Sequence, residues 1–471
     1  MTSETAAAPA PDFYTMILSA VDGAVVDDVG RLPMSDLQHI AHSTSRRLTA
    51  AGLKPAEPVL IPVSSRAEDV AAILGAIGAG AVAVPLHHRA HTDTVQHIRE
   101  VTGARFALET KSDTQRAAPG LCVSDQAAPA PRPLLDGAAM VTFTSGSTGK
   151  PKGVVLSRTR ISGKFQAIRT ALAMPASPVA AVPLQLQFSF GQWATFIPLM
   201  QGGTVHMTGR YSNDWMANLI RSEQLTYMAA VPTMLRMLVG TAPGNQAIEI
   251  LTGGEAVSAH LRRLIFCDWP RATIHSLFGL TETGTCDLLR TDRSSDDDRE
   301  SIGYPTPGVA VAVDPETGEL VIKSPFGMLG YLDMPDVTDT TLRNGWLKTG
   351  DKAEILADGE VVLSGRLKEL INRGGNKVSP LEVEAVFAEH PDISATLVTG
   401  VPDSRLGEAI HLMVVLQGDR SLTCNELINW ARPRTERFKL PDAIHFASAL
   451  PLGQTGKADR AAMRREILER S

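Results

Sequence analysis

FTSGSTGKPKG, at residues 143–153, combines three glycines, four hydroxyl side chains and two lysines in eleven positions. Gly146, Gly149 and Gly153 allow the backbone to approach a ligand closely, and the N–H, hydroxyl and ammonium groups are donors for phosphate oxygens. The stretch is not a P-loop, because Pro151 stands where that motif requires Ser or Thr. On composition alone such a stretch is more often a surface loop than a binding loop, so motifs elsewhere in the chain have to decide.

Six further motifs follow this loop and extend to residue 457. They are Gly253-Gly254-Glu255, Phe278-Gly279-Leu280-Thr281-Glu282, Thr349-Gly350-Asp351, Gly365-Arg366-Leu367-Lys368, Gly375 with Pro380 and Glu382, and Gly456-Lys457. In content and order they resemble the motifs of the adenylate-forming superfamily, which includes acyl-CoA synthetases, aryl-acid ligases, peptide-synthetase adenylation domains and beetle luciferase. The loop matches the family signature [YF]TSG[ST]TGxPKG at every position. The resemblance implies an enzyme that uses ATP and Mg²⁺.

The resemblance also implies which residues hold the nucleotide. Phe278 would lie on the adenine beside the glycine turn, the Asp351 carboxylate would accept both ribose hydroxyls, and Arg366 would contact the ribose or phosphate. Without the family, Phe278 is more simply a core residue and Asp351 a turn residue. The full set of expected nucleotide-binding residues is Thr144, Ser145, Gly146, Ser147, Thr148, Gly149, Lys150, Lys152, Gly254, Glu255, Phe278, Gly279, Asp351 and Arg366.

Lys457, Glu282 and Thr281 match the residues that act on the α-phosphate in the family. Attack of a carboxylate on that phosphate brings two anions together, so a cation placed there, Lys457, lowers the barrier by about a few kcal/mol, about 10²–10³ in rate. Glu282 matches the carboxylate associated with Mg²⁺, a hard cation that prefers oxygen ligands. Lys368 matches the hinge, where rotation would withdraw Lys457 and bring the Gly374-Gly375 loop toward a pantetheine thiol.

The segment Phe188-Ser189-Phe190-Gly191-Gln192-Trp193 bears on the acid that is activated. Amino-acid-activating relatives have Asp at the position of Ser189, and serine leaves a buried ammonium uncompensated at a cost of several kcal/mol. Aryl-acid ligases for hydroxybenzoates typically have Asn there, which is also missing. The expected pocket residues are Phe188, Ser189, Phe190, Trp193, Ala229, Leu251, Gly253, Leu277, Thr285 and Cys286. Two large rings favour an aromatic or small-to-medium aliphatic acid over a long acyl chain.

The expected function is activation of a non-amino-acid carboxylic acid to an acyl-adenylate with release of pyrophosphate, then transfer to the pantetheine thiol of CoA. An alternative acceptor is an acyl or peptidyl carrier protein in natural-product biosynthesis, because both acceptors present the same arm. A non-catalytic nucleotide-binding homologue is disfavoured because the whole phosphate loop, Glu282, Asp351 and Lys457 are intact. A luciferase-like oxidation has no positive support.

Composition excludes several other classes of protein. The 471 residues carry 45 Lys+Arg against 51 Asp+Glu, a formal net charge of −6 without a basic block, which disfavours nucleic-acid binding. The apolar run at residues 70–86 is interrupted by glycines and a proline, so we expect a helix leading into a strand and no membrane partner. The N-terminus lacks a basic region followed by an apolar one, and the four cysteines form no CxxC pair, so a cytoplasmic protein is expected. His87, His88 and His91 are expected to bind no metal.

Apolar strands such as PVLIPV (58–63) alternate with helical patterns such as residues 35–52, which predicts an α/β architecture. From about Gly318 the chain has short strands, with a hairpin turn predicted at Asp358-Gly359. With the resemblance, this predicts a large N-terminal domain, residues 1–366, of stacked α/β subdomains plus a β-rich subdomain. A small mobile α+β domain, residues 367–471, would carry the catalytic lysine.

Overall fold

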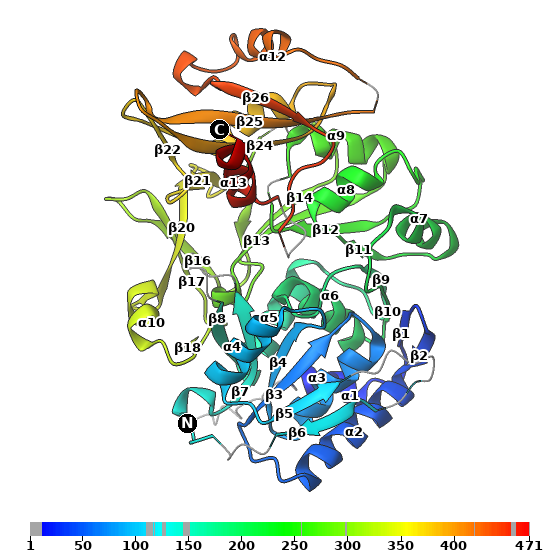
Figure 1. Cartoon of the computed structure of the whole chain (residues 1–471). Coiled ribbons are helices and arrows are strands. Elements are labelled where there is room, and N and C mark those ends of the chain that lie inside the picture. The colour runs from blue at the N-terminus through cyan, green and yellow to red at the C-terminus, as the bar shows by residue number, and fades with distance from the viewer. Residues whose placement is uncertain are drawn as a thin grey trace, which may run out of the picture.

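Apolar strands alternate with helices through most of the chain, and their parallel pairing builds two large sheets (Figure 1). The computed structural model describes residues 12–109, 116, 118–124, 129–144, 151–255, 257–296, 299–418, 420–453 and 458–470. The strands of two smaller sheets all lie in the chain from Ala310 onward. The predicted α/β class, with a large N-terminal part and a small C-terminal domain, is confirmed.

One large sheet has seven strands in the order β18-β8-β7-β4-β3-β5-β6. Its strands are β3 Pro58–Val63, β4 Val82–His87, β5 Phe106–Glu109, β6 Gly120–Val123, β7 Ala138–Thr144, β8 Lys152–Ser157 and β18 Gly330–Tyr331; helices α2 Met34–Ala50, α3 Ala67–Gly78 and α4 Thr92–Thr102 belong to the same part of the chain. The helix and strand predicted in residues 70–86 are confirmed as α3 and β4. Helix α3 is buried from Ala67 to Ile77, which explains why its residues after Asp69 are apolar or glycine. A Cβ at Gly75 would lie 2.6 Å from the Thr44 Cβ, so glycine permits the close packing of α3 on α2.

The other large sheet has nine strands in the order β15-β14-β13-β12-β11-β9-β10-β1-β2. Its strands are β1 Ala24–Asp27, β2 Gly30–Pro33, β9 Val179–Val182, β10 Thr204–Met207, β11 Tyr227–Ala229, β12 Glu249–Gly253, β13 Thr273–Phe278, β14 Leu288–Asp292 and β15 Tyr304–Pro305; the helices are α1 Phe13–Ser19, α5 Arg158–Ala171, α6 Ser189–Met200, α7 Asn213–Ser222, α8 Pro232–Leu238 and α9 Ala259–Asp268. Strands β9, β11, β12 and β13 run parallel. Their carboxyl ends therefore share one edge, where α/β sheets bind ligands.

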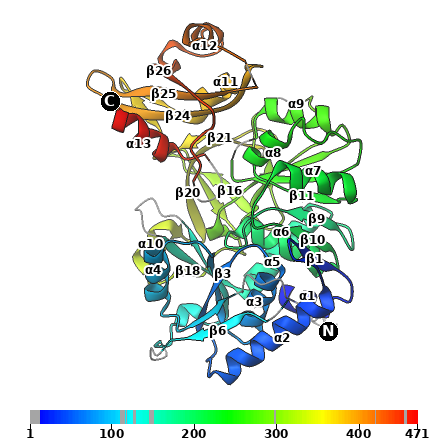
Figure 2. The same cartoon turned by 45° about the vertical axis from the view of Figure 1, so that its right-hand side comes forward.

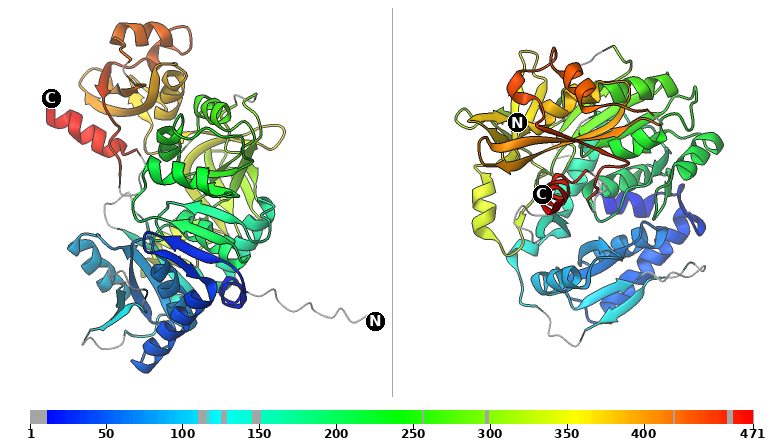
Figure 3. Two further views of the ribbon diagram at one scale, coloured as in Figure 1. Left: turned by 90° about the vertical axis from the view of Figure 1, so that its right-hand side faces the viewer. Right: turned by 45° about the horizontal axis from the view of Figure 1, so that its top comes forward.

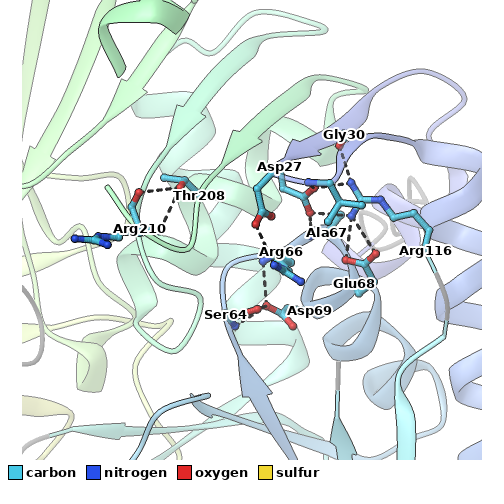
Figure 4. Close-up of polar contacts among 12 residues, drawn as sticks. Asp27, Gly30, Ser64, Arg66, Ala67, Glu68, Asp69, Arg116, Thr208 and Arg210 are labelled. Atoms are coloured by element: carbon cyan, nitrogen blue, oxygen red, sulfur yellow. Dashed lines mark hydrogen bonds and ion pairs between the residues drawn. The ribbon is translucent and has the colours of Figure 1, made fainter. Parts of the chain in front are cut away.

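A buried ion cluster joins the edge of the nine-stranded sheet to helix α3 (Figure 4). Arg116 donates to Asp27 at 2.6 and 2.8 Å and to the Glu68 carboxylate at 3.0 Å. Asp27 also accepts from the Ala67 N–H at 2.9 Å, at the start of α3. Burial raises the pKa of Asp27, but the hydrogen bonds from Arg116 and two backbone N–H groups outweigh it and hold that pKa below its usual range. The cluster thus ties the two large sheets together.

Short antiparallel strands form the β-rich part that sequence analysis predicted from about Gly318, and it begins earlier, at Ala310. They are β16 Ala310–Val313, β17 Glu319–Lys323, β19 Leu342–Arg343, β20 Trp346–Ile355 and β21 Val361–Arg366, with α10 Pro335–Thr341 between them. Strands β20 and β21 form a hairpin whose turn contains Asp358 and Gly359, the latter at φ 88°. This φ favours glycine, so the predicted turn is confirmed.

The C-terminal domain is a five-stranded sheet with three helices, placed at one end of the large part in Figures 1 and 2. Its elements are β22 Ile371–Arg373, β23 Asn376–Val378, α11 Pro380–Ala388, β24 Ile393–Asp403, β25 Gly407–Leu416, α12 Cys424–Ala431, β26 Ala443–Ala447 and α13 Arg460–Arg470. Helices α11 and α12 cover one core, while α13 packs over a second (Figure 3). The predicted boundary at residues 366 and 367 coincides with the end of β21 and stays a prediction. In the described part of the chain, no helix combines the length and apolar character needed to cross a membrane.

Candidate active site

The FTSGSTGKPKG stretch is the connection of an antiparallel hairpin. Thr144 at the end of β7 pairs with Lys152 at the start of β8, and Phe143 pairs with Gly153. A Cβ at Gly153 would lie 2.9 Å from Val141 Cγ1, which the packed sheet does not accommodate. The predictions for Ser145, Gly146, Ser147, Thr148, Gly149 and Lys150 fall outside the described residues. The hairpin fixes both ends of the predicted phosphate loop on the seven-stranded sheet.

Tyr331 connects this hairpin to the predicted magnesium ligand, and sequence analysis did not single it out. Strand β18 pairs with β8, which places the Tyr331 ring centroid 5.0 Å from the Lys152 Nζ. Its hydroxyl donates to Glu282 Oε1 at 2.8 Å. Burial raises the pKa of Tyr331, and the negative charge of Glu282 raises it further, so the phenol stays protonated and donates. No local pattern marks this tyrosine; only the pairing of β18 with β8 reveals its place.

Thr281 and Glu282 lie in a single turn of 3₁₀ helix, Thr281–Thr283, which a buried ion pair anchors. Asp287 accepts hydrogen bonds from the Thr283 hydroxyl and, at 3.4 Å, from the Leu280 N–H. Lys164 Nζ lies 3.0 Å from Asp287 Oδ1, and the two side chains are 1% and 0% exposed. Burial raises the pKa of Asp287, while the Lys164 charge opposes that effect. The ion pair therefore holds the turn that carries both predicted catalytic residues.

The Glu282 carboxylate fits a magnesium ion by its chemistry. It is half-buried, and its described hydrogen bond, from Tyr331, uses only Oε1. The described residues contain no group of three or more His, Cys, Asp or Glu side chains able to surround a metal, the histidines at positions 87, 88 and 91 included. A magnesium ion at Glu282 would thus take one protein carboxylate and complete its shell with phosphate and water oxygens, as this ion usually does.

The expected adenine site lies where β12 and β13 end. Gly253 pairs with Leu277, and Gly254 adopts φ 89°, so the backbone turns directly beside the end of β13. Phe278 is half-buried and packs partly against the core of the β-rich part. A Cβ at Gly279 would lie 2.4 Å from the backbone N of Cys286, so no side chain fits there. The structure brings the glycine turn and Phe278 to one edge, while the adenine contact itself stays a prediction.

Asp351 and Arg366 face each other across the β20–β21 hairpin. Arg366 Nε lies 3.0 Å from Asp351 Oδ1, and the Asp351 side chain is 5% exposed. Asp351 Oδ2 is buried and has no hydrogen-bond partner among the described residues. Burial raises the pKa of Asp351, and Arg366 opposes the rise. A buried acceptor without a donor is unfavourable, so this oxygen is suited to accept a hydroxyl group of a bound ligand.

Most of the expected pocket residues share one apolar cluster. Trp193, Ala229, Leu251 and Cys286 are buried in it, and Phe190 and Leu277 pack against them. Phe190 and Trp193 stack with ring centroids 5.1 Å apart. Burial raises the pKa of the Cys286 thiol to about 12, so this cysteine is a neutral wall residue. The structure assembles these pocket residues from α6, from β11, β12 and β13, and from the segment before β14 that contains Cys286.

The polar pocket residues lie beside the catalytic turn. Ser189 Oγ is 3.3 Å from Thr281 Oγ1, and both Ser189 and Thr285 line a cavity of about 20 Å³ together with Lys164 and Gln192. Sequence analysis missed Lys164, because helix α5 contains no family motif, and it gave Gln192 no role although Gln192 lies in the quoted segment 188–193. Phe188 occupies the N-cap position of α6, where its apolar side chain makes no capping hydrogen bond.

The C-terminal motifs lie at the junction of the two parts. Lys368 is in the turn between β21 and β22, and Gly374 and Gly375 form the turn between β22 and β23 at φ 58° and 87°. Lys457 and Gly456 lie outside the described residues. The next residue, Ala458, donates its backbone N–H to Glu255 Oε1 at 3.2 Å. The polypeptide directly after the predicted catalytic lysine therefore contacts the expected adenine turn.

Known proteins share the family and the fold of this chain. The family model "AMP-binding enzyme" matches residues 19–332, and the model "AMP-binding enzyme C-terminal domain" matches residues 382–457. A feruloyl-CoA synthase from Amycolatopsis sp is 28% identical, covering 93% of this chain and 94% of its own length. A fatty acid–[acyl-carrier-protein] ligase from Streptomyces coeruleorubidus is also 28% identical, covering 95% and 93%.

The fold is also that of solved structures. O-succinylbenzoate coenzyme A synthetase from Bacillus subtilis, in complex with ATP and a magnesium ion, has a TM-score of 0.82 at 23% identity and covers 96% of this chain and 98% of its own. The motifs, the two family models and the fold lead to one conclusion: the chain belongs to the AMP-binding enzymes of the adenylate-forming superfamily and is an AMP-forming acid–thiol ligase.

Proposed function

We propose that this ligase activates an aromatic or small-to-medium aliphatic carboxylic acid, other than an amino acid, and transfers the acyl group to the thiol of CoA. The observation that carries the proposal is the wall beside Thr281. Ser189 donates a hydrogen bond to the Thr281 hydroxyl, and Phe190 stacks on Trp193, so these wall residues are uncharged. The nearby Asp287 is already paired with Lys164. No described carboxylate remains on this wall to hold a substrate ammonium group, which favours an acid without one.

The chain's own residues have separable roles in this reaction. Asp351 Oδ2 accepts a hydrogen bond from a ribose hydroxyl, and the Arg366 charge beside Asp351 Oδ1 favours the ionised carboxylate. Lys152 and the phosphate loop hold the triphosphate, and the Thr281 hydroxyl donates to the α-phosphate. A magnesium ion bound at Glu282 supplies charge neutralisation for the phosphates. Lys457 places its ammonium where negative charge builds during attack by the substrate carboxylate, a contribution of about 10²–10³ in rate.

The second half-reaction uses a different arrangement of the same parts. Rotation about Lys368 withdraws Lys457 after the adenylate has formed and brings the Gly374-Gly375 turn toward the pantetheine arm. A Cβ at either glycine would meet no other atom within 4 Å, so this turn has an open surface for such an arm. This division assigns residues 1–366 to the nucleotide-binding domain and residues 367–471 to the mobile one.

CoA is the proposed acceptor, and a carrier protein is the alternative. The similar feruloyl-CoA synthase supports CoA, and the equally similar fatty acid–[acyl-carrier-protein] ligase supports a carrier protein. Both acceptors present a pantetheine thiol, so the residues above serve either. The reaction consumes ATP and the pantetheine thiol of CoA or of a carrier protein. We therefore propose that the protein acts in the cytoplasm.

A pyrophosphate-release screen tests the proposal. ATP, Mg²⁺ and a panel of benzoates, cinnamates, short and medium fatty acids and α-amino acids are supplied with and without CoA, and in parallel with a phosphopantetheine-loaded carrier protein. We expect release with aryl or alkyl acids and thioester formation on CoA, both lost in Lys457→Ala, which should still bind ATP. Pyrophosphate release that depends on α-amino acids would contradict the proposed class of acid. Thioester formation only on the carrier protein would show that the carrier, and not CoA, is the acceptor.

A further inference from the structure

One contact between the two domains lies beside the predicted catalytic lysine. The Ala458 N–H donates to Glu255 Oε1 at 3.2 Å, across 203 residues of sequence. Ala458 directly follows Lys457, and helix α13 begins shortly after it, at Arg460. Figure 1 draws this helix in red on the side of the C-terminal domain that faces the large part. The position of this N–H therefore fixes where the chain next to Lys457 meets the large domain.

The large domain holds Glu255 in one orientation. Thr233 Oγ1 donates to Glu255 Oε1 and Oε2 at 3.3 and 3.4 Å, and Arg236 Nη2 lies 3.4 Å from Oε2. Both partners come from α8 and are three residues apart, so they share one helical face. The Glu255 side chain is only 15% exposed. These contacts leave Oε1 directed at Ala458 and restrict rotation of the carboxylate.

The C-terminal domain holds Ala458 equally firmly. Ala458 forms an antiparallel bridge with Leu452, and the Asp459 N–H donates to Pro451 O at 2.8 Å. Arg460 then binds Glu384 of α11 and, at 3.0 Å, Glu369 beside the hinge. Burial lowers the pKa of Arg460, but the two carboxylates outweigh it and raise that pKa, so the guanidinium stays charged. Ala458 therefore moves with the body of its domain.

We propose that Arg236 and Thr233 are positioning residues for adenylate formation, because they hold Glu255 toward Ala458 and so keep the C-terminal domain docked with Lys457 at the nucleotide. The inference rests on the proposed function and adds a role for α8, which contains no family motif. Arg236 and Thr233 act through Glu255, and neither is a catalytic residue. The thioester half-reaction, for which the domain rotates, does not need this contact.

The test separates the two half-reactions in Arg236→Met and in the double variant Thr233→Val, Arg236→Met. Adenylate formation is measured by ATP–pyrophosphate exchange, and thioester formation is measured from preformed acyl-adenylate and the thiol. We expect exchange to fall about tenfold in the double variant, the usual effect of losing hydrogen bonds to a charged group. ATP affinity and thioester formation should change by less than about twofold. The matched control is Arg221→Met, an exposed arginine that binds Thr241 O on the same side of the domain.

A second measurement reports the domain arrangement without any reaction. Exposed Cys267 lies in α9 of the large domain and exposed Cys424 in α12 of the C-terminal domain. In a Cys122→Ser background, nitroxide labels on these two cysteines give an interdomain distance distribution by pulsed electron resonance. We expect one dominant distance in the parent protein and a broader distribution in the double variant. This comparison does not require the substrate acid to be known.

The outcomes distinguish this inference from the proposed function. The double variant could change the distance distribution while the parent protein shows no exchange activity. That result would overturn the proposed function and leave the docking role of the contact intact. An unchanged distribution in the double variant would overturn the positioning role. An equal fall in both half-reactions, or a fall in ATP affinity that accounts for the loss of exchange, would also overturn it, because these indicate general damage or direct nucleotide binding.

Discussion

Replacing Tyr331 with phenylalanine removes one hydroxyl from the centre of the site and little else. The ring stays packed at 5% exposure and 5.0 Å from Lys152, while Glu282 loses the hydrogen bond of 2.8 Å. A hydrogen bond to a charged group contributes about 1.5–3 kcal/mol. Water can reach the half-buried Glu282, so we use the lower value, about 1.5 kcal/mol, which corresponds to about tenfold in rate.

The assay is ATP–pyrophosphate exchange measured over a range of Mg²⁺ concentrations, with urea unfolding in parallel. We expect kcat/KM for ATP to fall about tenfold and the Mg²⁺ requirement to rise, because Glu282 loses the donor that orients it. Tyr211→Phe is the matched control, since its hydroxyl is also a hydrogen-bond donor, to Asn213 Oδ1 and to Met234 O, away from the site. Unchanged exchange at limiting Mg²⁺, or an equal loss in Tyr211→Phe, would refute the reasoning.

Three further predictions test other parts of the molecule. Asp351→Asn should raise the Kd for ATP about tenfold, measured by calorimetry, because the buried oxygen that would accept the ribose hydroxyl loses its charge; an unchanged Kd would contradict the ribose role. Arg116→Met should lower the free energy of unfolding by about 3 kcal/mol at pH 7, because it leaves the buried Asp27 charge unpaired. The pKa of Asp27 is lowered in the folded protein, so this stabilisation is present above the ordinary carboxyl pKa of about 4 and is lost as the pH falls through the lowered value. Urea unfolding should therefore show the two proteins converging below about pH 4, and a constant difference would contradict the cluster. Trp193→Ala should shift the preferred substrate in the pyrophosphate screen toward longer or bulkier acids, because it removes a fully buried ring from the pocket wall; an unchanged chain-length profile would place this ring outside the pocket.

Much of the fold follows from local pattern. The apolar run at residues 70–86 predicts α3 and β4 because Gly78 and Gly80 stand where the helix ends and before the strand begins. Asp358 and Gly359 predict their hairpin because the turn needs a positive φ. Both features depend on neighbouring residues only, and such features are visible in a single sequence.

Sequence analysis could name the candidate site residues that belong to a family motif. It could not name the residues that reach the site through contacts between elements far apart in the sequence. Phe278, Asp351 and Glu282 lie within motifs: Phe278 ends β13, Asp351 lies in the β20–β21 hairpin, and Glu282 lies in the 3₁₀ turn. Tyr331 and Lys164 are separated from Glu282 and Asp287 by 49 and 123 residues. Their contacts arise from the β18–β8 pairing and from the packing of α5, which no local pattern encodes.

The Lys164–Asp287 pair limits how the acyl pocket can change in evolution or in engineering. Either single replacement by an apolar residue leaves a buried charge without its partner, at a cost of about 3–5 kcal/mol. This is a large fraction of the about 5–15 kcal/mol that stabilises a typical domain. Replacing both with apolar residues of similar volume is often neutral. To reshape the pocket wall near Thr285, Lys164 and Asp287 should therefore be replaced together. In a library of single substitutions, variants at either position would be destabilised and would not be recovered.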